Sequence, residues 1–460
     1  MKSIFEERGI DRKVIIVGCT HAGTVAATQI LEDHPETDVT IYERHDNISF
    51  LSCGISLYLG GQVKRLEDMF YSNPEALRQL GATVRMKHDV LKIDAKQKEL
   101  TCENLDTNEV FTDSYDKLIM ATGSYVKVPP IMGVDHSRVL LCKDYAQAQA
   151  IYDTAKNHRR IAIVGGGYVG VELAESYANT DHEVSLIQGP DQLLNNYVDA
   201  ELAKVIETSL VNHGVHVYDR EHAHGFKGTD EVIVETNKGE HAADLAIVST
   251  GFVANTELLR GQVEMDRRGA LLIDDYMQTS DPAIYAAGDA SAVHYNPTGK
   301  TAYIPLATNA VRQGKLAAIN LFGHTQKYMG TQGTSAMSLF NHTLASTGLT
   351  LHHAQAAGFN AASVTYHDNY RPDYMPTTAM LTIILVYNRD NRQILGAQLY
   401  SKHEVAQSAN TISVCIQNKN TIDDLAYVDM LFQPNYDQPF NYLNLVAQMA
   451  IEQEKVAAKG

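Results

Sequence analysis

The chain has 460 residues, a length that accommodates about three domains with buried cores. It carries 38 Lys and Arg against 55 Asp and Glu, and its formal net charge of −17 at pH 7 argues against nucleic acid or an anionic membrane as a partner. With 44% hydrophobic and 20% charged residues, the composition is that of a globular protein rather than a disordered one. We therefore expect an acidic protein that handles small molecules.

No segment of the sequence predicts export or membrane insertion. Met1 to Lys13 lacks the apolar core of a secretory signal, and the longest apolar stretch, Met380 to Tyr387, is too short to span a bilayer. We therefore expect a cytosolic location. The five cysteines include no C-x-x-C pair, which argues against a disulfide scaffold and against a zinc site, so no metal is expected. A thiol with a function here would act through its reactivity.

Two segments share one pattern, a β-branched strand, a glycine turn, a helix and a second strand. The helix and the second strand are expected at Thr24–Leu31 and Val39–Tyr42 in the first segment, and at Val171–Ala178 and Glu183–Ile187 in the second. Each pattern indicates a β–α–β unit, and the two units predict two nucleotide-binding domains.

Three further strand ends indicate how these domains connect. Phe111 to Gly123 is interpreted as a strand that ends in Ala-Thr-Gly, Leu245 to Ser249 as one followed by Thr-Gly, and Ile284 to Asp289 as one that ends in Gly-Asp. Pro129 and Pro130 mark a linker. We therefore expect one discontinuous domain, residues 1–125 and 252–330, and a second domain inserted in it, residues 126–251.

The sequence changes character near Thr331. The expected strands are Ser363–Tyr366, Leu381–Tyr387 and Gln393–Leu399, and the expected helices are Val405–Gln417 and Thr421–Leu431. This pattern predicts a third, α+β domain over residues 331–460.

Two glycine loops carry the first chemical signal. Gly165 to Gly170 satisfies G-x-G-x-x-G between a strand and a helix, where glycines let the backbone approach a pyrophosphate and the helix supplies N–H donors. A glycine turn that only packs is the alternative. The loop Gly18 to Gly23 keeps the outer glycines but has Thr20 in the middle. Glu43 strengthens the interpretation of the Gly18–Gly23 loop as a dinucleotide site, because a carboxylate at the end of the next strand can accept from both hydroxyls of an adenosine ribose.

Two dinucleotide sites in one chain indicate one site for a bound flavin and one for a nicotinamide nucleotide, an arrangement that relays hydride. Asp289, directly after Gly288, supports the flavin because its carboxylate can bind the polyol; a solvated turn residue is the alternative. Cys53 follows Glu43 closely, and a helix that opens near it would lower the pKa of its thiol through the helix dipole. A buried, inert thiol is the alternative for Cys53.

The order of these motifs resembles the flavin-dependent pyridine-nucleotide disulfide reductase superfamily. The features are a glycine loop with a His, the Glu-ended strand, the SFLSCG segment, Ala-Thr-Gly, the second glycine loop, Thr-Gly and Ala-Ala-Gly-Asp. Within the superfamily the chain is similar to the single-cysteine branch that contains NADH peroxidase, coenzyme A-disulfide reductase and the bacterial water-forming NADH oxidases. The segments Ser413–Asn418 and Phe432–Tyr442 resemble the oxidases.

The resemblance implies a role for each residue that matches a family motif. It makes Cys53 the redox cysteine that cycles between thiolate and sulfenate, and His21 the catalytic histidine beside it. The implied FAD-binding residues are Gly18, His21, Ala22, Gly23, Glu43, Cys53, Thr122, Gly123, Lys143, Asp289, Ala307, Thr308 and Phe432. The NAD(P)-binding residues, from the second glycine loop and the resemblance, are Gly165, Gly167, Tyr168, Val169, Gly170, Gln188, Tyr197 and Gly251. Tyr168 matches the aromatic residue that covers the flavin until nicotinamide displaces it. Phe432 lies where the C-terminal domain reaches the partner subunit's flavin pocket, which implies a homodimer.

Two departures from the family refine these expectations. The neighbours of Cys53 are Ser49, Ser52 and Ser56 rather than a second cysteine, so an internal disulfide at the flavin is excluded. Gln188 stands where NADH-specific relatives have an acid, and residues 189–194 contain no Lys or Arg that could hold a 2′-phosphate. We therefore expect the chain to use both NADH and NADPH. The alternative is that Gln188 replaces the acid as an acceptor for the ribose and that NADH stays strongly favoured.

The expected fold is α/β, with two Rossmann-like dinucleotide-binding domains and a C-terminal α+β dimerisation domain. The resemblance implies an FAD-dependent NAD(P)H oxidase that reduces O₂ to two waters through the flavin and Cys53. The alternatives are an NAD(P)H peroxidase, a coenzyme A-disulfide reductase and, from another class, a flavin-bound redox sensor. Cys102, Cys142 and Cys415 are expected to be structural, and Cys19 has no assigned role.

Overall fold

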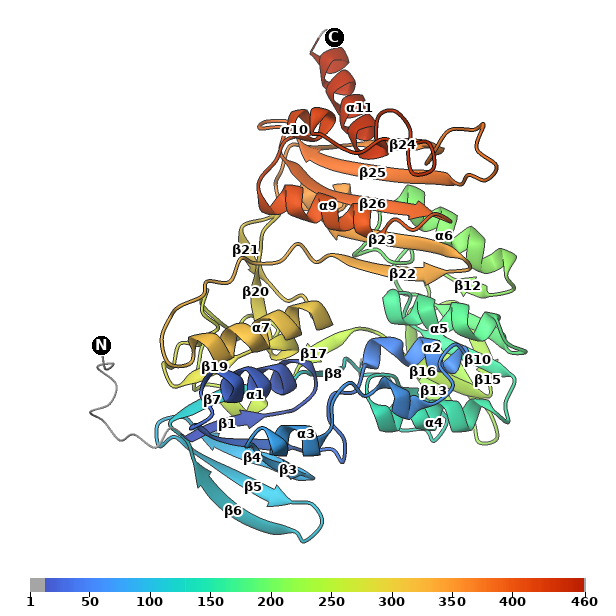
Figure 1. Cartoon of the computed structure of the whole chain (residues 1–460). Coiled ribbons are helices and arrows are strands. Elements are labelled where there is room, and N and C mark those ends of the chain that lie inside the picture. The colour runs from blue at the N-terminus through green and yellow to red at the C-terminus, as the bar shows by residue number, and fades with distance from the viewer. Residues whose placement is uncertain (1–12, 129, 459–460) are drawn as a thin grey trace, which may run out of the picture.

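The computed structural model describes residues 13–128 and 130–458, so the first twelve residues and Pro129 of the expected linker lie outside the described residues. Figure 1 shows two α/β units below a C-terminal unit that is drawn in orange and red. No helix in the described part of the chain is long and apolar enough to cross a membrane.

The first unit is built on a parallel five-stranded sheet. In spatial order its strands are β19 (Ile284–Ala286), β7 (Lys117–Met120), β1 (Lys13–Val17), β2 (Asp38–Glu43) and β3 (Thr83–Met86). Val14 and Ile16 face the helices α1 (His21–Asp33) and α7 (Ala307–Asn320). Ile15 and Val17 face the meander β4 (His88–Asp94), β5 (Glu99–Asn104) and β6 (Glu109–Ser114). Both faces are covered, which explains the uninterrupted apolar run of β1.

The second unit repeats this architecture. Its parallel strands, in spatial order, are β12 (His216–Tyr218), β11 (Glu183–Ile187), β10 (Arg160–Val164), β16 (Leu245–Val248) and β9 (Val139–Leu141). Ile161 and Ile163 pack against the helices α4 (Tyr145–Ala155), α5 (Tyr168–Ala178) and α6 (Ala200–Asn212). Ala162 and Val164 face the meander β13 (Ala223–Lys227), β14 (Val232–Thr236) and β15 (Glu240–Ala243).

The C-terminal unit is an antiparallel sheet with helices packed on it. Its strands, in spatial order, are β22 (Ser335–Leu339), β23 (His342–Gly348), β26 (Ile394–Ser401), β25 (Met380–Asn388) and β24 (Ala361–Asn369). The helices are α8 (Leu351–Ala356), α9 (Ala406–Gln417), α10 (Ile422–Tyr427) and α11 (Tyr442–Ala457). Ile412 of α9 and Val446 of α11 share one core with Leu385 of β25, so the helices and the sheet form a single layer pair.

Short elements join the units. The strands β8 (Ser124–Val126) and β17 (Phe252–Ala254) pair antiparallel, so the two chain crossings between the first and second units run side by side. A small sheet of β18 (Leu271–Leu272), β20 (Ser291–Tyr295) and β21 (Lys300–Ala302) precedes α7. The helices α2 (Ile55–Leu59) and α3 (Pro74–Gln79) lie between β2 and β3 in the chain.

Several expected elements have different bounds in the structure. Helices α1 and α5 begin at His21 and Tyr168, about one turn before the expected starts at Thr24 and Val171, because the last glycine of each loop lies inside the helix. The expected strand from Phe111 to Gly123 is wrong: it breaks after Ser114, and its two parts belong to different sheets. The last expected helix, Thr421–Leu431, ends earlier, since α10 stops at Tyr427.

Candidate active site

The first glycine loop turns sharply between β1 and α1. Gly18 has φ +92°, and a Cβ there would lie 2.4 Å from the Ala121 carbonyl oxygen. A Cβ on Gly23 would lie 1.9 Å from the Gly18 carbonyl oxygen. Both positions therefore require glycine. The N-cap residue Thr20 makes no side-chain cap, so the N–H groups at the start of α1 are available to an anionic ligand.

Glu43 closes β2 beside this loop. Its carboxylate is buried and accepts hydrogen bonds from the backbone N–H of Cys19 at 2.7 Å and of His45 at 2.9 Å. Burial raises the pKa of the Glu43 carboxyl, while these N–H donors lower it. Cys19, which had no assigned role, thus contributes a backbone donor that positions the acid.

Asp289 lies at the centre of a second polar group, next to the first loop. Its Oδ2 accepts from Ser124 Oγ at 2.6 Å and pairs with Lys143 Nζ at 3.0 Å. A Cβ on Gly288 would lie 3.3 Å from the Ala22 Cβ, so the Gly-Asp turn packs closely on the start of α1. Gln313 of α7 accepts from the Gly288 N–H at 2.9 Å, and its Nε2 is buried without a partner among the described residues.

His21, the first residue of α1, is held in one tautomer. The Tyr71 hydroxyl donates to the Thr20 carbonyl at 3.0 Å, and it can only accept from His21 Nδ1, 3.1 Å away. The proton of the neutral ring is therefore on Nδ1, and Nε2 is a bare acceptor. Nε2 is buried and has no partner among the described residues. Burial lowers the pKa of His21, with Asp289 opposing and Lys143 adding to the effect, so the neutral ring prevails at pH 7.

Cys53 is exposed in the short 3₁₀ turn Ser52–Gly54, which leads into α2. Helix α2 packs on α5, where Ser176 Oγ donates to the Ser56 carbonyl at 2.9 Å, so Cys53 lies at the junction of the first and second units. The expected lowering of the Cys53 pKa is wrong in direction. Removal from water raises it and Glu172 raises it further, while its own backbone N–H and Lys143 lower it. Helix α2 has only five residues, too few for a strong dipole.

The strand ends of the first sheet bring most of the expected FAD residues together. His21 follows β1, Glu43 ends β2, Thr122 and Gly123 follow β7, and Asp289 follows β19, so they share the carboxyl edge of one parallel sheet. Ala307 and Thr308 open α7. Lys143 acts electrostatically on both His21 and Cys53. Phe432 lies apart from this group, exposed on the C-terminal unit.

The second glycine loop has the same geometry as the first. Gly165 has φ +118°, and a Cβ on Gly170 would lie 1.7 Å from the Gly165 carbonyl oxygen. Gly167 is the N-cap of α5, and Tyr168 and Val169 form its first turn. Gly251 follows β16 at the same edge of the sheet, with φ +96°.

Three side chains lie beside this loop, those of Tyr168, Gln188 and Tyr197. Tyr168 packs edge-on against Tyr197 with ring centroids 4.2 Å apart, and its hydroxyl accepts from Ser335 Oγ at 3.0 Å. Gln188 is buried: its Oε1 accepts from the Gly166 N–H at 2.7 Å, and its Nε2 donates to the Gln192 carbonyl at 3.1 Å. Gln188 therefore braces the loop from within.

Three residues of the site, Tyr71, Glu172 and Gln313, were not predicted from the sequence motifs. Tyr71 and Gln313 come from separate segments, and no local motif marks either one. Glu172 lies one turn after Tyr168 on α5, and burial, with help from Glu175, raises the pKa of its carboxyl to about 7. The glycine loop predicted the helix that carries Glu172, but not that this side chain is half-buried.

The described residues fit a flavin dinucleotide. The glycine cradle and the uncapped α1 suit a pyrophosphate, Glu43 suits the ribose, and the unpaired His21 Nε2 and Gln313 Nε2 offer buried polar atoms to a ligand. Two glycine-loop units, with the exposed Cys53 at their junction, define a flavin- and nicotinamide-dependent oxidoreductase.

The chain belongs to the pyridine nucleotide-disulphide oxidoreductases. This family matches residues 12–314, and its dimerisation domain matches residues 334–442. An NADH oxidase of Enterococcus faecalis is 49% identical, over 96% of this chain and 99% of its own length. The solved structure of a water-forming NADH oxidase from Lactobacillus brevis, bound to NADH, is 53% identical and superposes with a TM-score of 0.96 over 97% of this chain and 99% of its own. A coenzyme A disulfide reductase of Staphylococcus aureus is 27% identical over 95% of this chain and 99% of its own length.

Proposed function

We propose that this chain is an FAD-dependent NAD(P)H oxidase that reduces O₂ to two molecules of water. The observation that carries the proposal is a lone exposed cysteine, Cys53, beside a glycine loop that suits a flavin dinucleotide. The chain is also similar, over 97% of its length, to a water-forming NADH oxidase. FAD, when bound, accepts hydride from the nicotinamide and passes two electrons to O₂.

Residues at the carboxyl edge of the first sheet would hold the FAD. The first glycine loop would bind the pyrophosphate, Glu43 the ribose, and Asp289 with Lys143 the polyol and ring. The second glycine loop would bind the nicotinamide nucleotide, with Tyr168 over the ring site. This assignment rests on the geometry of each loop and on the shared edge of the sheets.

Cys53 would complete the reduction at the level of hydrogen peroxide. Its thiolate attacks one peroxide oxygen, so an S–O bond forms, the O–O bond breaks, and the other oxygen leaves as water after taking a proton. Cys53 is then a sulfenic acid. A second NADH supplies two electrons, which cleave the S–O bond, restore the thiolate and release the second water.

His21 would move the protons for these steps at Nε2. With Nδ1–H held by Tyr71, Nε2 is a bare base that can take a proton from the thiol and return it to the leaving oxygen. The raised pKa of Cys53 makes such a base necessary at neutral pH.

The alternatives differ in what they consume. A peroxidase takes hydrogen peroxide from outside, a coenzyme A-disulfide reductase takes a disulfide, and a redox sensor turns over neither. A coenzyme A-disulfide reductase among the relatives keeps that alternative open, but at lower identity than the oxidases. The deciding experiment measures NADH oxidised per O₂ consumed. Two NADH per O₂ without hydrogen peroxide supports the proposal; one NADH per O₂, or no O₂ uptake, contradicts it.

We also propose the domain division 1–125 with 252–330, 126–251 and 331–460, with the last as the dimerisation domain. The antiparallel crossing of β8 and β17 supports the first two boundaries, and the match of residues 334–442 supports the third. In this homodimer Phe432 of each chain would reach the partner's flavin pocket. Five unpaired cysteines and a nicotinamide substrate support a cytosolic location.

A further inference from the structure

The loop that follows β12 lies against the loop that follows β11, at the end of the second β–α–β unit. The Gln188 N–H donates to the Tyr218 carbonyl at 2.8 Å, the Glu221 N–H to the Gln188 carbonyl at 3.0 Å, and the Arg220 N–H to the Pro190 carbonyl at 3.1 Å. In a dinucleotide-binding unit the end of the second strand is where the adenosine ribose is recognised. Residues 219–222 therefore border the ribose site, although they are distant from it in sequence.

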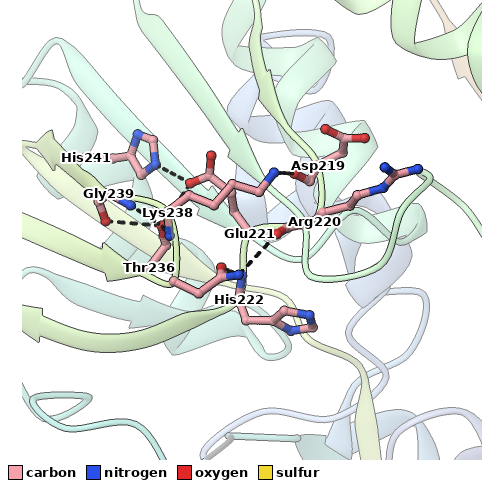
Figure 2. A network of polar contacts seen from close by, with 9 residues as sticks. Asp219, Arg220, Glu221, His222, Thr236, Lys238, Gly239 and His241 are labelled. Atoms are coloured by element: carbon pink, nitrogen blue, oxygen red, sulfur yellow. Dashed lines mark hydrogen bonds and ion pairs between the residues drawn. The ribbon is translucent and has the colours of Figure 1, made fainter.

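Side chains in this loop alternate between two environments. Glu221 is buried, accepts from the Thr236 hydroxyl at 2.9 Å and pairs with His241 Nε2 at 2.7 Å. Arg220 and His222, on either side of it, are exposed. Figure 2 shows the Arg220 guanidinium extending away from the polar network, while Glu221 turns into it. Glu221, one of the two acids of this loop, is thus turned inward and paired, whereas Asp219 enters the network only through its backbone carbonyl. Arg220 and His222 are left outside the network.

His222 lies directly against the turn after β11. A Cβ on Gly189 would lie 2.7 Å from His222 Nδ1, so the imidazole covers the Gly189 backbone. The loop is braced from behind, since Asn237 Oδ1 accepts from the His222 N–H at 2.7 Å and Lys238 Nζ donates to the Asp219 carbonyl at 2.8 Å. The backbone that carries Arg220 and His222 is therefore held in place before any ligand binds.

Gln188 removes the usual obstacle to a phosphate at this position. It is neutral and buried, and its amide oxygen is occupied by the Gly166 N–H. No carboxylate at residue 188 therefore faces the ribose 2′ position. The side chains able to read that position come from Arg220 and His222.

We propose that Arg220 and His222 form a subsite for the 2′-phosphate of NADPH. A guanidinium offers two parallel N–H donors that match two phosphate oxygens, and the imidazole offers a further donor. The cationic group that residues 189–194 lack is supplied by the loop after the next strand. The inference rests on the proposed use of nicotinamide nucleotides and adds the residues that recognise the phosphate.

The test uses two adenosine fragments, 2′,5′-ADP and 5′-AMP, titrated calorimetrically into the FAD-loaded enzyme. The wild type is expected to bind 2′,5′-ADP more tightly than 5′-AMP. Arg220→Gln should reduce the ratio of the two affinities by roughly 10- to 100-fold, and His222→Gln by less. Arg220→Lys should restore part of the ratio because it keeps the charge. Arg267→Gln, at an exposed arginine of the first unit, is the matched control and should leave the ratio unchanged.

Equal binding of the two fragments to the wild type, or an unchanged ratio in Arg220→Gln, would overturn the proposal. Oxygen consumption is measured on the same preparations to keep the two proposals separate. If the enzyme prefers 2′,5′-ADP but oxidises neither NADH nor NADPH, the result supports the phosphate subsite and contradicts the oxidase function. If the enzyme oxidises NADH and forms water but binds the two fragments equally, the result contradicts only the phosphate subsite.

Discussion

Cys53 differs from the other four cysteines in its surroundings. Cys19, Cys102 and Cys142 are buried and Cys415 is partly buried, whereas Cys53 is exposed at the junction of two units. Burial raises the thiol pKa of Cys19, Cys102 and Cys142 to about 12, which makes these groups inert at neutral pH. Cys53 is the exposed one of the five, which supports the proposal that it is the reactive thiol.

Replacing Cys53 with Ser is expected to change the product rather than stop oxygen uptake. A hydroxyl is a poor nucleophile toward peroxide, so Cys53→Ser should still consume O₂ and should release about one hydrogen peroxide per O₂. A catalase-sensitive oxygen electrode measures both quantities. Cys415→Ser is the control and should form water as the wild type does. Clean water formation by Cys53→Ser would remove this cysteine from the mechanism.

Glu172 predicts a pH dependence of stability. Its carboxyl has a pKa of about 7 in the fold against an ordinary value of 4.5, because burial opposes its charge. Between these values the folded chain binds more protons, so the contribution of this group to stability is complete below about pH 4.5 and is lost as the pH rises through about 7.

Glu172→Gln should remove the loss of stability that the ionisation of Glu172 causes as the pH rises through about 7. The Tm of the variant, relative to wild type, is therefore expected to be higher at pH 8 than at pH 5, as followed by circular dichroism. Glu99→Gln, at an exposed position of β5, serves as the control. A Tm difference that stays constant between pH 5 and pH 8 would show that Glu172 titrates normally.

At the scale of elements, both β–α–β units could be predicted because each depends on local signals. β-branched runs, glycines with positive φ and a following helix are all consecutive in sequence. Contacts between distant segments left no such signal. Tyr71 reaches His21 across the unit, and Arg220 reaches Pro190 from the next strand, so only the folded chain reveals these pairs. Strands β22 and β23 were not predicted, because Ser and Thr interrupt their apolar pattern. Helix α11 was not predicted either, although its buried residues recur at helical spacing.

Helix α5 contacts strands β22 and β23 through Tyr168. The Tyr168 hydroxyl accepts from Ser335 at 3.0 Å and lies 3.4 Å from Ser346 Oγ, and the two serines are directly opposite in the strand pair. If Tyr168 must move to admit nicotinamide, these contacts oppose its movement.

Replacing both Ser335 and Ser346 with Ala should therefore lower the KM for NADH about 2- to 10-fold with little change in kcat, because only the cost of displacing Tyr168 falls. Steady-state kinetics measures both constants. Ser338→Ala, at an exposed position of β22, is the control. An unchanged KM in the double variant would mean that the serines do not restrain the ring.

At the scale of the whole molecule, the C-terminal unit has an apolar surface that nothing covers within the described part of the chain. The exposed large apolar side chains from the end of α10 to the start of α11 are Tyr427 at 72%, Val428 at 49%, Leu431 at 68%, Phe432 at 47%, Tyr436 at 66% and Phe440 at 52% exposure. Such clustering on one segment is typical of an interface between subunits. The expected helix over Thr421–Leu431 stops early at this patch, because Val428, directly after α10, takes a non-helical ψ of 141°.

If two chains share each active site, defects in different subunits should complement one another. Phe432→Ala is expected to lose most water formation, because each subunit then lacks the Phe432 that it would supply to the partner's active site. Cys53→Ser is expected to lose water formation because each subunit lacks the cysteine of its own active site. When the two variants are unfolded together and refolded with FAD, half of the dimers should be mixed, and each mixed dimer has one site with both residues intact. Water formation should therefore recover to about a quarter of the wild-type value, whereas each variant refolded alone stays defective. Val110→Ala, at an exposed residue of β6, should behave as wild type. Water formation by Phe432→Ala alone at the wild-type rate, or no recovery in the mixture despite dimers in sedimentation analysis, would show that each site is built from a single chain.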